Sequence, residues 1–580
     1  MNHLLPEQAN LSASNGFSAL DIRLGEWTAR LAKTSRNKSL LVATVALLSR
    51  AVREGHVCLY LNELAEAPSD TFPPLESFKQ ALFDSGLAGS PETVRPLILD
   101  EANRLYFYRY FQYESALLNH LTSFCQEETV LDERCYDALD RLFGPDSRIH
   151  PNPQRQAADT ALSGRFCVVS GGPGTGKTWI AVRILWILTK IMDRKVALAA
   201  PTGKAAARLE QSLRESLKTL PPELDPTLLP KACTLHRLLE PIPHSPYFRY
   251  NAENRLPVED VIIDEASMID LPLFAKLVSA LPDTGRLILL GDRHQLASVE
   301  TGAALNDICS AADRGGCYNR LTKRSVTLML SRRFSQDSPL GKLAQLVNQG
   351  EGEAAISLME DAGIWKPLSS SRQLNDRLTR TIEPWLSDYL TSAEPDSAFN
   401  RLDALKILCA LNRSAYGIHA VNDVIGKLAL SKQPTAQPGR QGGLYRGFPV
   451  MVLRNDYAAG LFNGDTGVAF PDAEGRMYFH FKADNGFHPM APLKLPEHQT
   501  AYALTVHKSQ GSEFGKVILI LPPFDSEVIT RELIYTALTR AKESVEVWGD
   551  KGVFIRAVGR KIERRSGLTD RLLQRLNQPV

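Results

Sequence analysis

Residues 171–178 read GGPGTGKT and lie between an apolar run, residues 166–169, and a segment of helical periodicity that begins at Trp179. Glycines let backbone N–H groups close around phosphate groups, and a helix N-terminus favours anions. Lys177 can reach the β- and γ-phosphates, and the Thr178 hydroxyl can ligate Mg²⁺. The chain is therefore predicted to bind a nucleotide and Mg²⁺ through Gly171, Gly172, Pro173, Gly174, Thr175, Gly176, Lys177 and Thr178.

Short β-rich runs alternate with helical segments after this loop, which is the pattern of a parallel α/β sheet. The first series comprises residues 166–169, 196–199, 261–263 and 287–290, and the second comprises 406–410, 516–520 and 545–548. We therefore expect an α/β fold with two similar domains in series. The region before about residue 150 forms a separate unit with helical periodicity over residues 40–52.

Two insertions interrupt this pattern. Residues 433–443 are rich in Pro, Gly and Gln, and residues 448–481 read as short strands with turn signals, so a small β-barrel is expected there. Residues 241–258 carry Pro, Asn and aromatic residues and are expected to form a projecting hairpin.

The overall composition is that of a soluble globular protein, with 580 residues, 44% hydrophobic and 23% charged. No apolar stretch near the start is long enough to cross a bilayer, so we expect a cytoplasmic protein. The net charge is only +2, but residues 551–580 contain eight Lys or Arg and two acids. This basic segment suits either contact with nucleic acid or an acidic protein face, or a solvated helix.

Acidic and amide side chains follow two of the predicted strands. Asp264 and Glu265 end an apolar strand, so that Asp264 can hold Mg²⁺ and Glu265 can orient or deprotonate the attacking water. Asp292 and Gln295 follow the next strand, at the sheet edge where α/β proteins place their sites, and are candidate γ-phosphate sensors.

The ordered motifs resemble those of superfamily 1 helicases, and most closely the RecD family, the alpha subunits of exodeoxyribonuclease V (RecBCD). They are QRQA (154–157), GGPGTGKT (171–178), APTGKAAARL (200–209), TLHRLL (234–239), VIIDEASM (261–268), GDRHQL (291–296), LSRRF (330–334), TVHKSQGSEF (505–514) and ELIYTALTRAKE (532–543). The resemblance implies a partner-docking domain over residues 1–120, a first RecA-like domain over 121–335, and a second over 336–580 with an SH3-like barrel at about 433–495.

The resemblance also implies roles for single residues. Gln154 would contact adenine, and Arg333 and Arg540 would be arginine fingers, although Arg332 is an alternative to Arg333. Glu513 and Gln510 would couple the DNA track to ATP. Residues at the family's DNA-facing positions are Thr202, Lys204, His236, Thr505, His507 and Ser509.

The implied function is that of an ATP-dependent helicase subunit that moves 5′-to-3′ on single-stranded DNA, binds DNA ends and has RecB and RecC as partners. A regulatory ATP-switched subunit and a stand-alone helicase remain alternatives. No nuclease site is assigned, because only about forty residues follow Arg540. Within the N-terminal unit, Phe107 and Tyr110 are candidate docking anchors, with core packing as the alternative for each. Phe248 and Tyr250 of the hairpin are candidates for separating strands, with packing of the hairpin onto its own domain as the alternative.

Overall fold

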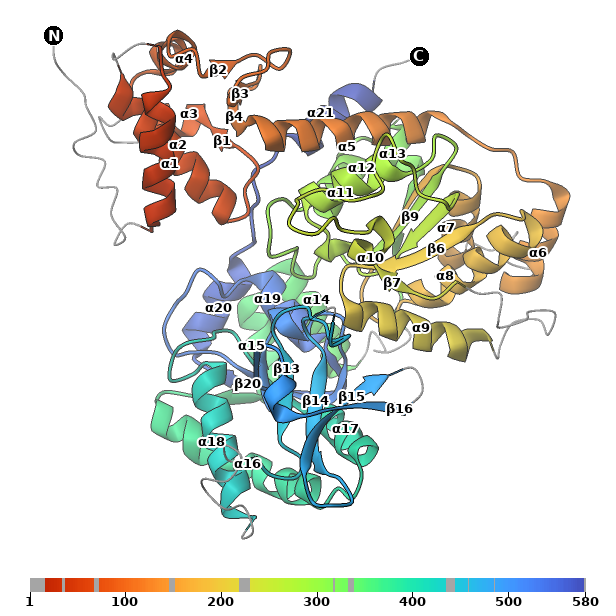
Figure 1. Cartoon of the computed structure of the whole chain (residues 1–580), viewed down its shortest axis with the longest axis vertical. Helices are drawn as coiled ribbons and strands as arrows, with labels where there is room; N and C mark the ends of the chain where they lie inside the picture. The colour runs from red at the N-terminus through yellow and green to blue at the C-terminus, as the bar shows by residue number, and fades with distance from the viewer. Residues whose placement is uncertain are drawn as a thin grey trace.

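The computed structural model describes residues 16–33, 37–66, 72–144, 152–217, 230–316, 319–331, 338–433, 444–456, 458–483 and 486–577. Three bodies are visible in Figure 1: an N-terminal body at the upper left, a first α/β domain at the upper right and a second α/β domain below. Within the described ranges, no helix combines the length and the apolar character that crossing a membrane requires.

The N-terminal body is mainly helical, as predicted, and the expected helix over residues 40–52 is α2. A capping box between Ser18 and Asp21 starts its first helix. Its sheet has the order β1-β4-β3-β2. The elements are α1 (Ala19–Arg30), α2 (Lys38–Arg53), β1 (Leu59–Tyr60), α3 (Leu61–Ala65), α4 (Leu75–Asp84), β2 (Ala88–Gly89), β3 (Leu97–Leu99) and β4 (Arg104–Phe107).

Helix α5 (Tyr108–Gln126) leaves this body and packs against α11 (Leu271–Ala280) of the first α/β domain. The domain boundary expected at residue 120 therefore falls inside one continuous helix. Because α5 buries Leu117 and Leu121 in the core of the first α/β domain, it belongs physically to both bodies.

The first α/β domain contains a six-stranded parallel sheet with the order β10-β5-β9-β8-β6-β7. The four predicted strands are confirmed, and two short edge strands are added. The strands are β5 (Phe166–Gly171), β6 (Val196–Ala200), β7 (Cys233–Thr234), β8 (Asp260–Ile263), β9 (Arg286–Gly291) and β10 (Ser325–Leu328).

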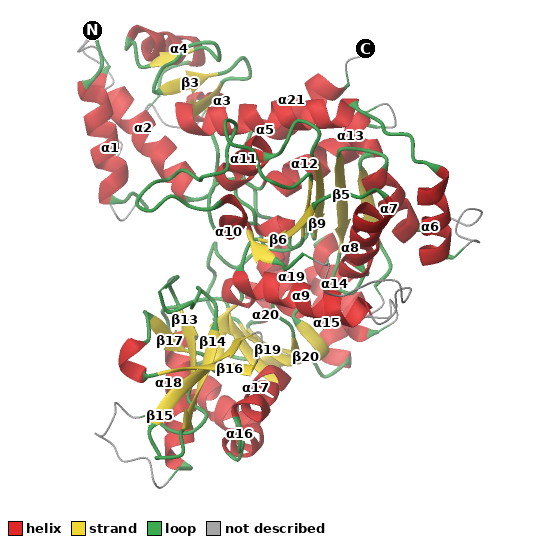
Figure 2. Ribbon diagram, turned by 45° about the vertical axis from the view of Figure 1, so that its right-hand side comes forward, coloured by secondary structure: helices red, strands yellow, loops and turns green. Residues whose placement is uncertain are grey.

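Helices cover both faces of this sheet (Figure 2). One face carries α6 (Glu133–Phe143), α7 (Pro153–Leu162), α8 (Lys177–Trp186), its π-helical extension η4 (Ile187–Ile191) and α9 (Gly203–Leu217). The other face carries α5, α10 (Leu235–Leu239), α11, α12 (Ala304–Arg314), α13 (Arg320–Lys323) and α21 (Leu568–Leu576).

The second α/β domain contains a five-stranded parallel sheet with the order β11-β20-β19-β12-β18, which confirms the second predicted series. Its strands are β11 (Trp365–Pro367), β12 (Leu405–Cys409), β18 (Ala503–Thr505), β19 (Phe514–Ile520) and β20 (Ala541–Gly549). The helices are α14 (Pro339–Gln349), α15 (Gly352–Asp361), α19 (Arg531–Leu538) and α20 (Lys551–Gly559) on one face, and α16 (Ser371–Leu390), α17 (Pro395–Ala404) and α18 (Ile418–Ser431) on the other.

The expected β-rich insertion is an antiparallel sheet with the order β16-β15-β14-β13-β17, hereafter the inserted sheet. No pairing joins β16 to β17 among the described residues, so closure into a barrel is not confirmed. Its strands are β13 (Pro449–Val452), β14 (Thr466–Pro471), β15 (Met477–Ala483), β16 (Gly486–Met490) and β17 (His498–Thr500).

The basic C-terminal segment makes contacts with its own chain that neither predicted alternative included. After α20 the chain crosses back to the first α/β domain, where α21 packs against α12 and α5. Leu568, Leu572 and Leu576 are buried there. Arg571 forms an ion pair with Glu114 at 2.9 Å, so the segment binds its own chain, because an apolar stripe along α21 draws it onto the core.

Candidate functional site

The phosphate-binding loop has the backbone that its sequence predicts. Gly174 and Gly176 adopt φ values of 76° and 92°, which glycine reaches without steric cost. Helix α8 begins immediately afterwards at Lys177, so its N-terminus points at the loop. Lys177 Nζ donates to the carbonyls of Gly171 at 2.7 Å and Gly172 at 3.1 Å. The loop is therefore closed around its own lysine.

Thr178 and Asp264, the two expected Mg²⁺ ligands, lie together. Thr178 Oγ1 donates to Asp264 Oδ2 at 3.2 Å. Burial raises the pKa of Asp264, and the neighbouring Glu265 carboxylate raises it further, while Lys177 opposes both effects. Glu265 has a φ of 54°, a costly conformation for a non-glycine residue. A hydroxyl beside a carboxylate is a donor set that suits Mg²⁺.

The loop after β9 holds Asp292 and Gln295 in a buried network. Asp292 Oδ2 accepts hydrogen bonds from Gln295 Nε2 and from Tyr535 of the second α/β domain, both at 3.1 Å. Gln295 Oε1 in turn accepts from Arg540 Nη2 at 2.8 Å. Gln295 lines the nucleotide cavity. Asp292 is buried outside the cavity lining and fixes the Gln295 side chain through its hydrogen bond.

Arg540 comes from the second α/β domain and is only 1% exposed. Its Nη1 donates to the carbonyl of Ser512 at 3.1 Å, while its buried Nε has no hydrogen-bond partner in the described part of the chain. Burial lowers the pKa of Arg540. A guanidinium with an unsatisfied N–H beside the cavity suits the charge that develops on a transferring phosphoryl group.

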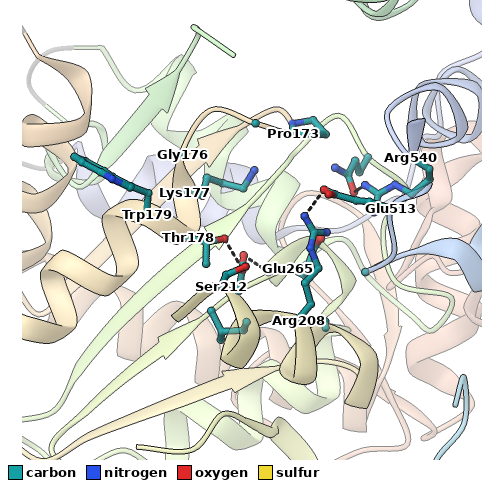
Figure 3. A pocket seen from close by; sticks show the side chains of 16 residues that line it. Pro173, Gly176, Lys177, Thr178, Trp179, Arg208, Ser212, Glu265, Glu513 and Arg540 are labelled. Carbon is teal, nitrogen blue, oxygen red and sulfur yellow. Dashed lines mark hydrogen bonds and ion pairs between the residues drawn. The ribbon is translucent and has the colours of Figure 1, made fainter. Parts of the chain in front are cut away.

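One cavity of about 220 Å³ lies between the two α/β domains (Figure 3). Its lining includes Lys177, Thr178, Asp264, Glu265, Gln295 and Arg540. Arg208 of α9 extends across it and forms an ion pair with Glu513 of the second domain. Sequence reasoning missed Arg208, although its position four residues after Lys204 in the APTGKAAARL motif placed it one helical turn further along α9. Trp179 and Ser212 also line the cavity and were not predicted.

Two further predicted nucleotide contacts differ in status. Gln154 Nε2 donates to the carbonyl of Thr175 at 3.0 Å, which places it beside the phosphate-binding loop. Arg333 and its alternative Arg332 lie outside the described residues. The preceding residue, Ser331, donates to the carbonyl of Pro173 at 2.8 Å, so the described part of this motif reaches the loop.

A second cavity, of about 330 Å³, separates the first α/β domain from the inserted sheet. Thr202 and His236, two of the six predicted DNA-facing residues, line it. Arg237 reaches across it, and its guanidinium lies 4.0 Å from the centre of the Phe462 ring. We call this cavity the groove; its other lining residues include Thr234, Arg454, Asn455 and Asn463.

The other four predicted DNA-facing residues do not line the groove. Thr505 and Ser509 are buried, and their hydroxyls bond to the backbone of the turn η8 (His507–Ser509), as short hydroxyl side chains often do. Burial lowers the pKa of His507. Lys204 Nζ lies 5.8 Å from the centre of the Phe514 ring in the second α/β domain. Lys508, which was not predicted, donates to Asn463 at 3.2 Å and so reaches the groove.

Three family models match parts of the chain. Residues 13–106 match the RecBCD enzyme subunit RecD N-terminal domain, residues 154–301 match an AAA domain, and residues 500–547 match a UvrD-like helicase C-terminal domain. The second and third matches contain the phosphate-binding loop and the Glu513 turn, respectively. The nucleotide cavity therefore joins the two regions that these models describe.

Similarity to individual proteins extends over most of the chain. The RecBCD enzyme subunit RecD of Haemophilus influenzae is 30% identical, over 89% of this chain and 87% of that protein. RecD of Mycolicibacterium smegmatis is 34% identical, over 91% and 93%. The ATP-dependent RecD2 DNA helicase of Deinococcus radiodurans is 28% identical, over 71% of this chain and 51% of that protein. With the first two relatives matching along nearly their whole length, the chain belongs to the RecD family.

Proposed function

We propose that this chain is the ATP-dependent DNA helicase subunit of a cytoplasmic RecBCD-like complex that processes double-strand breaks for recombinational repair. The hydrogen bond between Arg540 and Gln295 carries the proposal, because it joins one group from each α/β domain at the nucleotide cavity. A guanidinium supplied across a cleft makes hydrolysis depend on closure of that cleft. Closure driven by ATP is the motor step.

Each residue has a distinct task in hydrolysis. Lys177 leaves the carbonyls of its own loop to bind the β- and γ-phosphates, and Arg540 stabilises the charge of the transition state. Glu265 orients the attacking water. Thr178 and Asp264 would hold Mg²⁺, which would neutralise phosphate charge. The ion pair between Arg208 and Glu513 spans the same cavity and opens as the nucleotide enters.

The groove is the path of single-stranded DNA. Thr202 offers a hydroxyl and His236 a ring that can stack on a base, and both face the inserted sheet. Such contacts favour a DNA strand without selecting its sequence. The 5′-to-3′ direction is proposed from membership of the RecD family.

The N-terminal body docks RecB and RecC. Helix α1 exposes Leu20, Trp27 and Leu31, at 70%, 59% and 51%, and spacings of seven and four residues place them on one side of the helix. The predicted anchors Phe107 and Tyr110 instead pack partly buried against the cores of the chain. The apolar stripe of α1 is therefore the better docking surface.

Replacing Trp27 by Glu tests the docking surface. It should abolish co-purification with RecB and RecC while leaving DNA-stimulated ATPase measurable. Val94→Glu is the matched control, because Val94 is 78% exposed on the same body but belongs to the loop between β2 and β3 rather than to α1. Equal loss of assembly in both variants, or in neither, would refute the role of the stripe.

Unwinding by the assembled complex, with the partner's motor inactivated, tests the function itself. Duplexes with a 5′ or a 3′ single-stranded tail are offered, and strand displacement is measured with ATP. We expect displacement from the 5′-tailed substrate only. ATP hydrolysis without displacement from either substrate would favour the regulatory alternative, and displacement from the 3′-tailed substrate alone would overturn the direction.

A further inference from the structure

Residues 560–567, hereafter the strap, connect α20 of the second α/β domain to α21 on the first. The first part of the strap is held by the second domain. Arg560 Nη2 binds Asp525 at 2.8 Å, and the carbonyl of Arg560 accepts from the Arg531 amide at 2.9 Å. The Ile562 amide donates to Glu532 Oε2 at 3.1 Å. Up to residue 562 the strap therefore moves with the second domain.

Arg564, only two residues later, is held by the first domain. Its guanidinium donates to the carbonyls of Ser298 and Glu300, and to that of Gly302 at 2.9 Å. These carbonyls belong to residues 298–302, hereafter the sensor loop, which begins three residues after Gln295. The strap therefore crosses between the domains at Glu563, and a two-residue span of about 7 Å has little slack.

The N-terminal body holds the same loop from another side. Thr301 Oγ1 donates to the carbonyl of Val52 at 3.1 Å, and the Gly302 amide donates to that of Gly55 at 2.9 Å. The next strap residue continues the junction, because the Arg565 amide donates to His56 Nδ1 at 3.0 Å. All three bodies of the molecule thus meet at the sensor loop.

A cavity beside the strap leaves room for the two α/β domains to move relative to each other. A cavity of about 340 Å³ separates the two α/β domains there, lined among others by Gln295, Asn306, Arg531, Ile562 and Arg564. Side chains in a close-packed interface could not shift without overlap, whereas a cavity of this size lets the domains approach. On the other side of the loop, Leu296 bonds to Thr536 at 2.9 Å and to Gln510 at 2.8 Å.

We propose that the strap is a mechanical tie, with Arg564 as a positioning residue, that converts movement between the α/β domains into movement of the sensor loop. The tie passes the displacement of the sensor loop to the partner-docking N-terminal body. The inference rests on the proposed helicase function and adds a route by which the ATP cycle and the docked subunits influence each other.

The sharpest test lengthens the strap without removing a side chain. Two glycines inserted between Glu563 and Arg564 add about 7 Å of slack. In the full complex with the partner's motor inactivated, base pairs opened per ATP should fall about fivefold, while kcat and KM for DNA-stimulated hydrolysis stay within about twofold. Arg564→Gln should show the same split, and Arg564→Lys should recover part of the loss.

Two controls match these variants. The same insertion after Gly475, in an exposed turn of the inserted sheet, keeps coupling intact. Arg565→Ala removes the ion pair with Glu63 but keeps the backbone bonds of the strap, and it too should leave coupling unchanged.

Base pairs opened per ATP, kcat and melting temperature together distinguish a mechanical tie from a strap that only stabilises the fold. Unchanged base pairs per ATP in the insertion variant would overturn the tie. An equal fall of kcat and unwinding, with a lowered melting temperature, would overturn it as well, because only folding would then be affected. Absence of 5′-tailed unwinding in the unmodified complex would instead refute the proposed helicase function.

Discussion

The two α/β domains face the nucleotide cavity with opposite ends of their strands. In the first domain, Asp264 and Asp292 directly follow β8 and β9, at the carboxyl ends of the strands. In the second, Glu513 and Arg540 directly precede β19 and β20, at the amino ends. The first domain thus builds the phosphate-binding loop and the proposed Mg²⁺ site from its own loops, whereas the second domain contributes Glu513 and Arg540 only when it lies against the first.

Lys177→Gln should remove the first domain's contribution to ATP hydrolysis, and we expect this to be the largest effect. The variant keeps the loop but loses the cation on the β- and γ-phosphates, so DNA-stimulated ATPase should fall by several orders of magnitude. DNA binding should persist, because the groove lies elsewhere. Steady-state ATPase and DNA binding by the same preparation check this, and near-normal ATPase in a folded variant would contradict the assignment.

Arg540→Lys should show whether the second α/β domain contributes to catalysis without contributing to nucleotide affinity. Lysine keeps the charge but cannot hold Gln295 and the Ser512 carbonyl with one planar group. We expect kcat to fall about 10²-fold to 10³-fold while ADP affinity changes much less. Measuring both quantities sharpens the comparison, since an equal loss of affinity would mean that the second domain contributes to ground-state binding as well.

The same contrast explains what the sequence could predict. The nucleotide residues of the first domain occupy contiguous motifs next to apolar strands, so strand prediction alone brought Lys177 and Asp264 together. Arg208 and the strap contacts of Arg564 depend on how separate bodies pack, which local patterns do not encode. Thr505 and Ser509 show why a motif alone does not identify DNA contacts, because a hydroxyl can bond to a DNA phosphate or to the backbone. Thr505 Oγ1 accepts from the Lys508 amide, and Ser509 Oγ donates to the Val506 carbonyl.

The aromatic residues of the hairpin, residues 241–258, also differ from the sequence-based expectation, and they lead to a prediction of intermediate size. The predicted strand-separating residues pack inward, with Phe248 only 8% exposed and Tyr250 against the core of the first α/β domain. Tyr247 is instead 68% exposed. Stacking on an aromatic ring contributes about 1–3 kcal/mol per base, so Tyr247→Ala should lower base pairs opened per ATP by about threefold without changing ATPase.

Tyr136→Ala is the control for this substitution, because Tyr136 is 41% exposed on α6, away from the hairpin. Comparing unwinding per ATP in the two variants tests whether the first domain also contacts the duplex. Loss in both variants, or in neither, would remove the strand-separating role from Tyr247.

The last predictions concern stability, where one buried group in each α/β domain gives an opposite pH dependence. Burial raises the pKa of Asp307 in the first domain to about 7 from its ordinary 3.8, and burial lowers that of Lys406 in the second to about 7 from 10.5. The loss of folding stability caused by Asp307 therefore grows as the pH rises from about 4 to 7, whereas the loss caused by Lys406 disappears as the pH rises from about 7 to 10.5.

Asp307→Asn should stabilise the protein at pH 8 but not at pH 4, and Lys406→Met should stabilise it at pH 6 more than at pH 10. Each gain is at most about 5 kcal/mol, from a shift of roughly three to three and a half pKa units. Urea unfolding at these pH values checks both, and gains independent of pH would show that packing rather than ionisation is responsible.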